Sequence, residues 1–194
     1  MHYHQALKFF NEKNYDKAFN FFELAGCFYE CGYCKFIQGD INSAQNYWRK
    51  NDIDSPAINW GFNIIDIVKL TIPSTLTFFQ IRNFLERDMQ NLFENNQLKM
   101  LENIMSASDI LAEFNPESYK FIGRVLLNNG YFDLSNDFLK KSLDICYTDC
   151  ETHFLLAQYY IYKQDIKSAI KILKESISIN SGYFPAKNLL KSLN

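Results

Sequence analysis

A spacing of 34 residues recurs through the second half of this chain of 194 residues. Three sets of residues follow it: Met89, Gly123 and Ala157; Asn96, Gly130 and Gln164; and Leu101, Ser135 and Ala169. A repeat of this length, continued without gaps, is typical of stacked copies of one helix–turn–helix unit. We therefore predict an all-α fold, an α-solenoid of stacked antiparallel helix–turn–helix repeats with about 12 helices and a C-terminal capping helix.

The turn inside each unit, together with the start of the second helix, recurs as a short window. The windows are FNEKNYDKA (10–18), FIQGDINSA (36–44), FENNQLKML (93–101), LNNGYFDLS (127–135) and IYKQDIKSA (161–169). Each begins with an apolar residue, passes through a polar turn and mostly ends in a small residue. Small residues let two antiparallel helices approach closely. Gly32, Gly61 and Gly123 would be the matching small positions on the first helices.

This pattern resembles the tetratricopeptide repeat (TPR) family. The similarity is clearest in residues 116–149 and 150–183, where aromatic, large and small residues fall on the positions of the family motif. These residues are Tyr119, Ile122, Gly123, Leu126, Phe132, Ser135, Leu139 and Ser142, and then His153, Leu156, Ala157, Tyr160, Ile166, Ala169, Leu173 and Ser176. Residues 82–115 match more weakly, and the proline that usually ends a repeat is missing. The resemblance implies a helical-repeat fold with a protein-binding, non-catalytic function.

We expect one helical-repeat domain over residues 1–194. Ala6, Gly32 and Gly61 look equivalent but are closer than 34 residues, so the N-terminal repeats must be shorter. Pro73 cannot sit inside a helix without cost, which indicates a break there. The expected parts are short divergent repeats at 1–70, an irregular connection at 71–81, three 34-residue repeats at 82–183 and a capping helix at 184–194.

Helix boundaries follow from capping residues and prolines. Ser55-Pro56 and Asn115-Pro116 are expected helix starts, and Asp40 and Asp165 are expected N-caps. The expected helices span residues 2–12, 15–25, 27–38, 41–50, 55–69, 76–95, 97–113, 116–128, 131–146, 150–163, 166–179 and 184–192.

Composition narrows the class of function. The net charge is −2 with both signs interspersed, so we expect no nucleic-acid partner. The N-terminus lacks a basic region followed by an apolar run, and the stretch from Trp60 to Leu70 is too short and too polar to span a bilayer. We expect a cytoplasmic protein without membrane insertion, whose five cysteines are reduced.

The TPR resemblance implies that the first helix of each repeat lines a concave groove. We predict that a protein or peptide segment binds there, with aromatic anchors in the N-terminal half and polar contacts in the C-terminal half. The alternative is that these aromatic side chains only pack against neighbouring helices. Exposed aromatic residues at the N-terminal end could also drive homo-oligomer formation. The predicted partner-binding residues are Tyr29, Tyr33, Phe36, Phe62, Gln90, Lys120, Arg124, Asn128, Gln158 and Tyr162.

Some TPR proteins hold a C-terminal carboxylate with a clamp of Lys, Asn and Arg. Lys120 and Arg124 share one helix face here, but His153 and Leu155 stand where the partners of the clamp would be needed. The clamp is therefore incomplete. Asp88, by contrast, is interpreted as a solvated helix charge.

Cys27, Cys31 and Cys34 form the run CFYECGYC, which resembles the cluster motif of radical S-adenosylmethionine enzymes. That family needs a β/α barrel, and this chain shows no strand-like alternation. On a helix the three thiols share one face, where buried cysteines usually pack as small apolar side chains. We predict packing and no cofactor. The alternative is a metal- or redox-responsive protein, in which His2 or His4 would supply a fourth zinc ligand.

Catalytic motifs are absent from the sequence, which has no glycine-rich phosphate loop, no G-x-S-x-G and no H-E-x-x-H. We predict that the chain is not an enzyme but a scaffold or adaptor. A further alternative is an accessory subunit of an enzyme or of a secretion complex.

Overall fold

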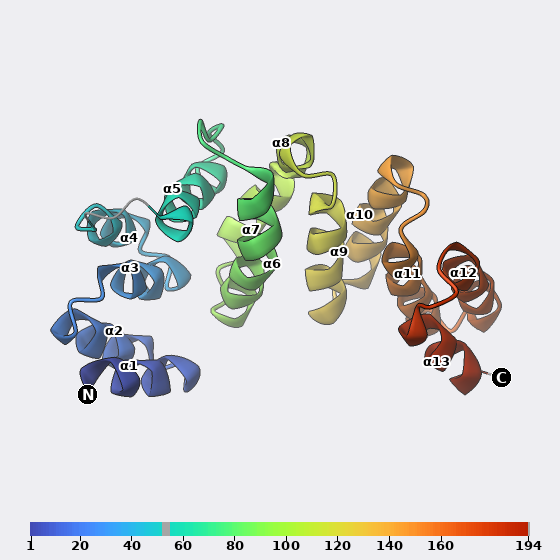
Figure 1. Cartoon of the computed structure of the whole chain (residues 1–194), viewed down its shortest axis with the longest axis horizontal. Helices are drawn as coiled ribbons and strands as arrows, with labels where there is room; N and C mark the ends of the chain where they lie inside the picture. The colour runs from blue at the N-terminus through green and yellow to red at the C-terminus, as the bar shows by residue number, and fades with distance from the viewer. Residues whose placement is uncertain (52–54, 194) are drawn as a thin grey trace. The chain divides into compact units, whose positions relative to one another are not determined.

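The computed structural model describes residues 1–51 and 55–193, and these residues form 13 α-helices and no β-strand (Figure 1). The all-α prediction is confirmed. The helices are α1 (His2–Asn11), α2 (Tyr15–Leu24), α3 (Phe28–Ile37), α4 (Ile41–Trp48), α5 (Pro56–Val68), α6 (Phe78–Glu94), α7 (Leu98–Ser106), α8 (Ser108–Phe114), α9 (Ser118–Asn128), α10 (Phe132–Ile145), α11 (Cys150–Tyr162), α12 (Ile166–Ile179) and α13 (Phe184–Ser192).

The helices pack into two compact units, Met1–Ile110 and Leu111–Asn194. The boundary between the units falls inside α8, and also inside the first of the three 34-residue repeats expected from the sequence. The division into parts at 70, 81 and 183 stays a prediction. Position 194, the last residue of the expected capping segment, lies outside the described residues.

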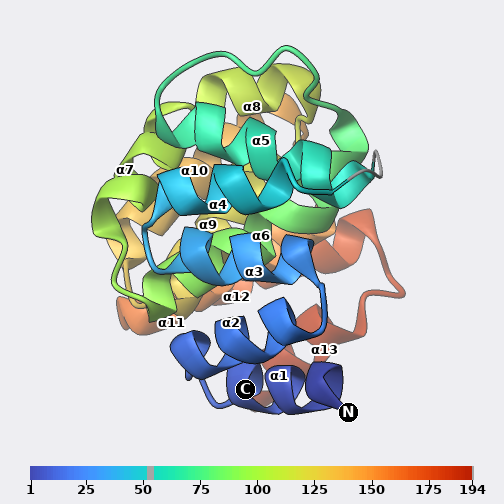
Figure 2. The ribbon, with the colours of Figure 1, turned by 90° about the vertical axis from the view of Figure 1, so that its left-hand side faces the viewer.

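In the first unit, helices α1 to α5 stack in chain order, each against the next (Figure 2). Helix α6 then packs against α5 and α7, and also against α3. The contact between α3 and α6 joins segments far apart in the sequence. It forms one side of the candidate site described below.

In the second unit, α9 pairs with α10 and α11 pairs with α12, and α13 packs on α12. Apolar residues 34 positions apart supply the core, because Ile122 and Leu156 are both buried, as are Leu139 and Leu173. Ala186 of α13 is buried against Ala157 and Leu173, so α13 closes the apolar face of the last hairpin.

The fourth residue of every turn window adopts a left-handed backbone conformation. The φ angles are +58° at Lys13, +86° at Gly39, +58° at Asn96, +82° at Gly130 and +59° at Gln164. In each turn the next backbone N–H bonds to a carbonyl five residues earlier, as in Asn14 N to Phe9 O at 2.9 Å. This is the Schellman geometry that ends a helix. The five windows therefore share one turn structure, although only two of them have glycine at this position.

Trp48 of α4 explains two of the helical glycines. A Cβ atom on Gly61 would lie 2.8 Å from Cε3 of Trp48, and one on Gly32 would overlap the indole Nε1. Trp48 is only 1% exposed, and its Nε1 donates a 3.0 Å hydrogen bond to the carbonyl of Tyr29. Gly32 and Gly61 thus make room for one large ring between α3 and α5, rather than for close helix–helix contact alone.

Two expected boundaries are wrong. The helix expected over 97–113 is broken at Ala107 into α7 and α8. The Asn115-Pro116 pair does not start α9, which begins at Ser118, because the Asn115 carboxamide oxygen instead accepts a 2.9 Å hydrogen bond from the N–H of Glu117. The other signals are confirmed: Ser55, Asp40 and Asp165 cap α5, α4 and α12.

Candidate functional site

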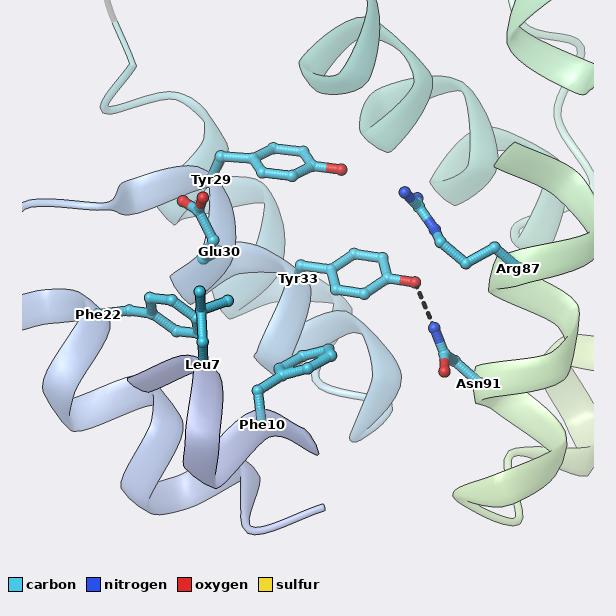
Figure 3. Close-up of a pocket in the computed structure, with 8 residues that line it drawn as sticks. All are labelled: Leu7, Phe10, Phe22, Tyr29, Glu30, Tyr33, Arg87 and Asn91. Atoms are coloured by element: carbon cyan, nitrogen blue, oxygen red, sulfur yellow. Dashed lines mark hydrogen bonds between the residues drawn. The ribbon is translucent and has the colours of Figure 1, made fainter. Parts of the chain in front are cut away.

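A cavity of about 330 Å³ opens between α1, α2, α3 and α6, all within the first unit (Figure 3). Helix α1 supplies two apolar side chains, α2 one, α3 two tyrosines and a glutamate, and α6 two polar residues. The lining residues are Leu7, Phe10, Phe22, Tyr29, Glu30, Tyr33, Arg87 and Asn91. We call this cavity the aromatic pocket.

The rings of the aromatic pocket pack against one another. The Tyr29 and Tyr33 rings are stacked, with centroids 6.3 Å apart and planes 17° apart. The centroid of Phe10 lies 6.0 Å from that of Tyr33 and 6.4 Å from that of Phe22. Contacts of this kind fix ring orientation and add stabilisation beyond burial. The wall of the pocket is therefore ordered without a partner.

A buried hydrogen-bond network holds Tyr33 in place. Its hydroxyl donates to Oδ1 of Asp88 at 2.6 Å and accepts from Nδ2 of Asn91 at 2.7 Å. Asp88 is 1% exposed, and its Oδ2 accepts a 2.6 Å bond from Nε1 of Trp60. The network joins α3, α5 and α6. Asp88 is thus a buried structural acceptor, and its interpretation as a solvated helix charge is wrong.

Arg87 neutralises this carboxylate. Its Nε and Nη2 lie 2.8 Å and 2.7 Å from Oδ1 of Asp88. The guanidinium also lies 4.9 Å from the ring centroid of Tyr33, within the range of a cation–π contact. Arg87 therefore contributes a paired cation, rather than a free one, to the edge of the aromatic pocket.

Both tyrosines of the pocket keep their protons at neutral pH. Burial raises the pKa of Tyr33 well above its ordinary value, and the charge of Asp88 raises it further. Burial also raises the pKa of Tyr29. Their hydroxyl groups are therefore hydrogen-bond donors in the folded protein.

The predicted partner-binding residues of the first unit separate into different environments. Tyr29 and Tyr33 line the aromatic pocket. Phe36 is fully buried in the core, so its prediction as a groove residue is wrong, because no surface remains for a partner. Phe62 is half-buried, with its ring centroid 6.1 Å from that of Trp48. Gln90 is half-buried on α6 outside the pocket lining, and its Nε2 donates to Glu94 at 3.1 Å.

Lys120, predicted as a polar groove residue, is buried in an ion-pair cluster. Its Nζ lies 2.7 Å from Glu117, 2.9 Å from Asp149 and 3.4 Å from Glu151. Burial lowers the pKa of Lys120, but Asp149 and Glu117 outweigh it and raise the pKa above its ordinary value. The prediction for Lys120 as a partner-binding residue is therefore wrong, because its ammonium group is buried and already paired with three carboxylates of the same unit.

The other polar candidates of the second unit are more accessible. Arg124 is half-buried and pairs with Glu151 at 2.8 Å. Asn128 and Gln158 are exposed at the surface of α9 and α11. Tyr162 is exposed, and its ring stacks on that of Phe132 with centroids 3.5 Å apart.

The cysteine run does not form a metal site in the described part of the chain. Cys31 and Cys34 are fully buried, whereas Cys27 precedes α3 as its N-cap residue. Burial raises the pKa of both Cys31 and Cys34 to about 12, so the thiols stay protonated. Among residues 1–51 and 55–193, no group of three or more His, Cys, Asp or Glu side chains could hold a metal ion.

Sequence reasoning missed most of the pocket. Leu7, Phe10, Phe22, Glu30, Arg87 and Asn91 were not predicted as site residues. Only a crowding of aromatic residues in the first 36 positions hinted at it. No local signal pairs α3 with α6, because the contact joins residues more than 50 positions apart.

Among residues 1–51 and 55–193, none of the helices combines the length and the apolar character that a membrane span requires.

Comparison with known proteins agrees with this architecture. Residues 151–183, which cover most of α11, all of α12 and the turn after it, match the family model described as tetratricopeptide repeat. The chain contains a tetratricopeptide repeat. The TPR resemblance read from the sequence is therefore confirmed. No curated protein matches the chain.

Solved structures that match this chain include those of TPR proteins. The C-terminal part of a TPR repeat-containing protein from Cytophaga hutchinsonii matches with a TM-score of 0.50 and 14% identity, over 99% of this chain and 70% of that one. A chain of the APC/C hetero-tetramer Cut9–Hcn1 matches with a TM-score of 0.45 and 19% identity, over 97% of this chain. The present chain therefore spans only 34% of the length of the matched Cut9–Hcn1 chain. YrrB, a TPR protein with an unusual peptide-binding site, matches with a TM-score of 0.44 and 14% identity, over 98% and 90%.

Proposed function

We propose that this TPR-containing chain is a non-catalytic scaffold that binds a segment of a protein partner, and that the segment is anchored in the aromatic pocket. One observation carries the proposal: a cavity of about 330 Å³ lined by ordered aromatic rings stays open between α1, α2, α3 and α6. Large apolar side chains in such pockets are the usual source of binding energy at protein interfaces.

The side chains that line the pocket are preorganised for binding. Ring stacking and the bonds of Tyr33 to Asp88 and Asn91 fix its wall. A partner therefore does not have to pay the entropy of ordering those side chains, which is a main cost of association.

Accessible residues of the second unit supply further groups for contact with a partner. Arg124, Asn128, Gln158 and Tyr162 offer hydrogen-bonding groups on the first helices of two repeats. We assign them to further contacts with a partner, together with Gln90 and Phe62 of the first unit. Lys120 and Phe36 are excluded because both are buried and neither lines the aromatic pocket.

Selection from a library of random 12-residue peptides displayed on phage tests the proposal. The full chain is the target, and dissociation constants of the selected peptides are measured by fluorescence polarisation. Leu7→Trp fills the pocket from α1, while Leu24→Trp places the same ring on a residue of α2 that is 68% exposed and outside the pocket. We expect Leu7→Trp to weaken binding about tenfold or more, and Leu24→Trp to leave it unchanged. Equal binding by both variants, or no binding peptide at all, would refute the proposal.

A further inference from the structure

We infer that the segment bound in the aromatic pocket carries an apolar side chain next to a lysine or arginine, and that Glu30 pairs with this cation. The inference deepens the proposed function and rests on it. The geometry is visible in Figure 3, where Glu30 of α3 and Arg87 of α6 lie on opposite sides of the pocket.

The charges around the pocket do not cancel. Arg87 and Asp88 neutralise each other through one hydrogen bond and one further ion-pair contact, at 2.8 Å and 2.7 Å. Glu30, which is half-buried, forms no hydrogen bond or ion pair with any other described residue. The lining therefore keeps one unneutralised negative charge. Because the Glu30 carboxylate is partly buried and no described residue places a cation beside it, a partner with a positive charge at this place would bind more favourably.

The apolar wall can contact both the methylene groups of a bound lysine or arginine and the apolar residue next to it in the segment. Lysine and arginine bury their methylene groups along apolar surface while the charged head stays near water. Tyrosine and phenylalanine rings also attract a cation placed over them. The chain already uses this contact, since Nζ of Lys35 lies 4.5 Å from the ring centroid of Phe19.

The size of the pocket limits the occupant. A volume of about 330 Å³ is at the lower end of the roughly 300–1,000 Å³ range of ligand pockets. It holds one large side chain with part of a neighbour, and not a packed helix. Two adjacent residues of an extended segment, one apolar and one basic, match this space and this charge.

The test extends the peptide selection to variants of Glu30. Glu30→Gln removes the charge with little change of shape, Glu30→Lys reverses it, and Glu113→Gln is a matched control at an exposed residue of α8 outside the pocket. We expect the selected peptides to share an apolar residue beside Lys or Arg. Glu30→Gln should weaken their binding about three- to tenfold and Glu30→Lys more, while Glu113→Gln should change nothing.

A double-mutant cycle isolates the pair. Replacing the basic residue of a selected peptide by alanine should weaken binding to the natural chain, but should have little effect on binding to Glu30→Gln. Peptides that Leu7→Trp blocks but Glu30→Gln binds unchanged would overturn this inference and leave the proposed function standing. So would a consensus of acidic residues. Selection of no pocket-dependent peptide would instead remove the proposed function itself.

Discussion

The hydroxyl of Tyr33 donates a 2.6 Å hydrogen bond to Oδ1 of Asp88, 55 residues further along the chain. This bond connects α3 with α6, and the bond from Trp60 to the same carboxylate adds α5. A buried carboxylate is costly unless it is paired and hydrogen-bonded, and Asp88 meets both conditions. The position of the aromatic pocket therefore depends on one buried anion and its partners.

Tyr33→Phe should lower the free energy of unfolding by about 1–3 kcal/mol. The change deletes the hydroxyl and leaves Oδ1 of Asp88 and Nδ2 of Asn91 each short of one buried hydrogen bond. Urea denaturation followed by circular dichroism measures the loss. Tyr47→Phe is the control, because the Tyr47 hydroxyl donates to Glu23 at 2.6 Å but in an exposed setting. A loss no larger in Tyr33→Phe than in this control would contradict the role of the network.

Gly32→Ala should destabilise the protein by about 1–3 kcal/mol, because the added methyl group would overlap the indole of Trp48. Gly182→Ala is the matched control, since its Cβ atom would meet only the side-chain oxygen of Asn180, at 3.2 Å in an exposed turn. Thermal melting of both variants tests this. Equal melting temperatures would mean that Trp48 does not fill the space beside Gly32.

Lys120→Met should cost about 2–3 kcal/mol. Removal of the buried ammonium leaves three carboxylates facing one another, although their partial exposure keeps the loss below that of a fully buried pair. Lys99→Met provides the comparison, because Lys99 forms an exposed pair with Glu102 at 3.3 Å and such pairs contribute little. Chemical denaturation that shows the two substitutions to be equivalent would rule out the buried cluster.

Acid should weaken the same cluster. Burial alone raises the pKa of Asp149, but Lys120 and hydrogen bonds from Glu151 and Thr152 outweigh it and lower the pKa below 3.8. Because the folded-state pKa is the lower one, this stabilisation is complete above about pH 5 and is lost as the pH falls through the folded-state value. Asp149→Asn should therefore flatten the acid limb of a stability–pH curve. An acid limb of unchanged slope in this variant would argue against the pairing.

The buried thiols should resist modification. Burial raises the pKa of Cys31 and Cys34 to about 12, so neither supplies a thiolate at pH 8. Exposed Cys146 should react with Ellman's reagent within minutes, whereas Cys31 and Cys34 should react only after unfolding in guanidinium. Rapid reaction of all five thiols in the native protein would show that these two cysteines are not in a packed core.

The repeats were readable from the sequence because their signals are local. A polar turn and a small residue lie within one hairpin, and the 34-residue spacing only repeats that local unit along the chain. The left-handed residue at 13, 39, 96, 130 and 164 lies within the same turn. The break at Ala107 and the late start of α9 were not readable, because helix ends depend on hydrogen bonds that compete within a few residues.

The sequence by itself determined that this chain forms helical hairpins with equivalent turns, because periodicity and turn chemistry act over short distances along the chain. Only the tertiary structure decided which side chains remain accessible. It buried Phe36 and Lys120, paired Arg87 with Asp88, and left Glu30 beside an open pocket. The aromatic pocket depends on the contact between α3 and α6, and the burial of Lys120 depends on carboxylates at the start of α11. No local pattern specifies such contacts between separate helices.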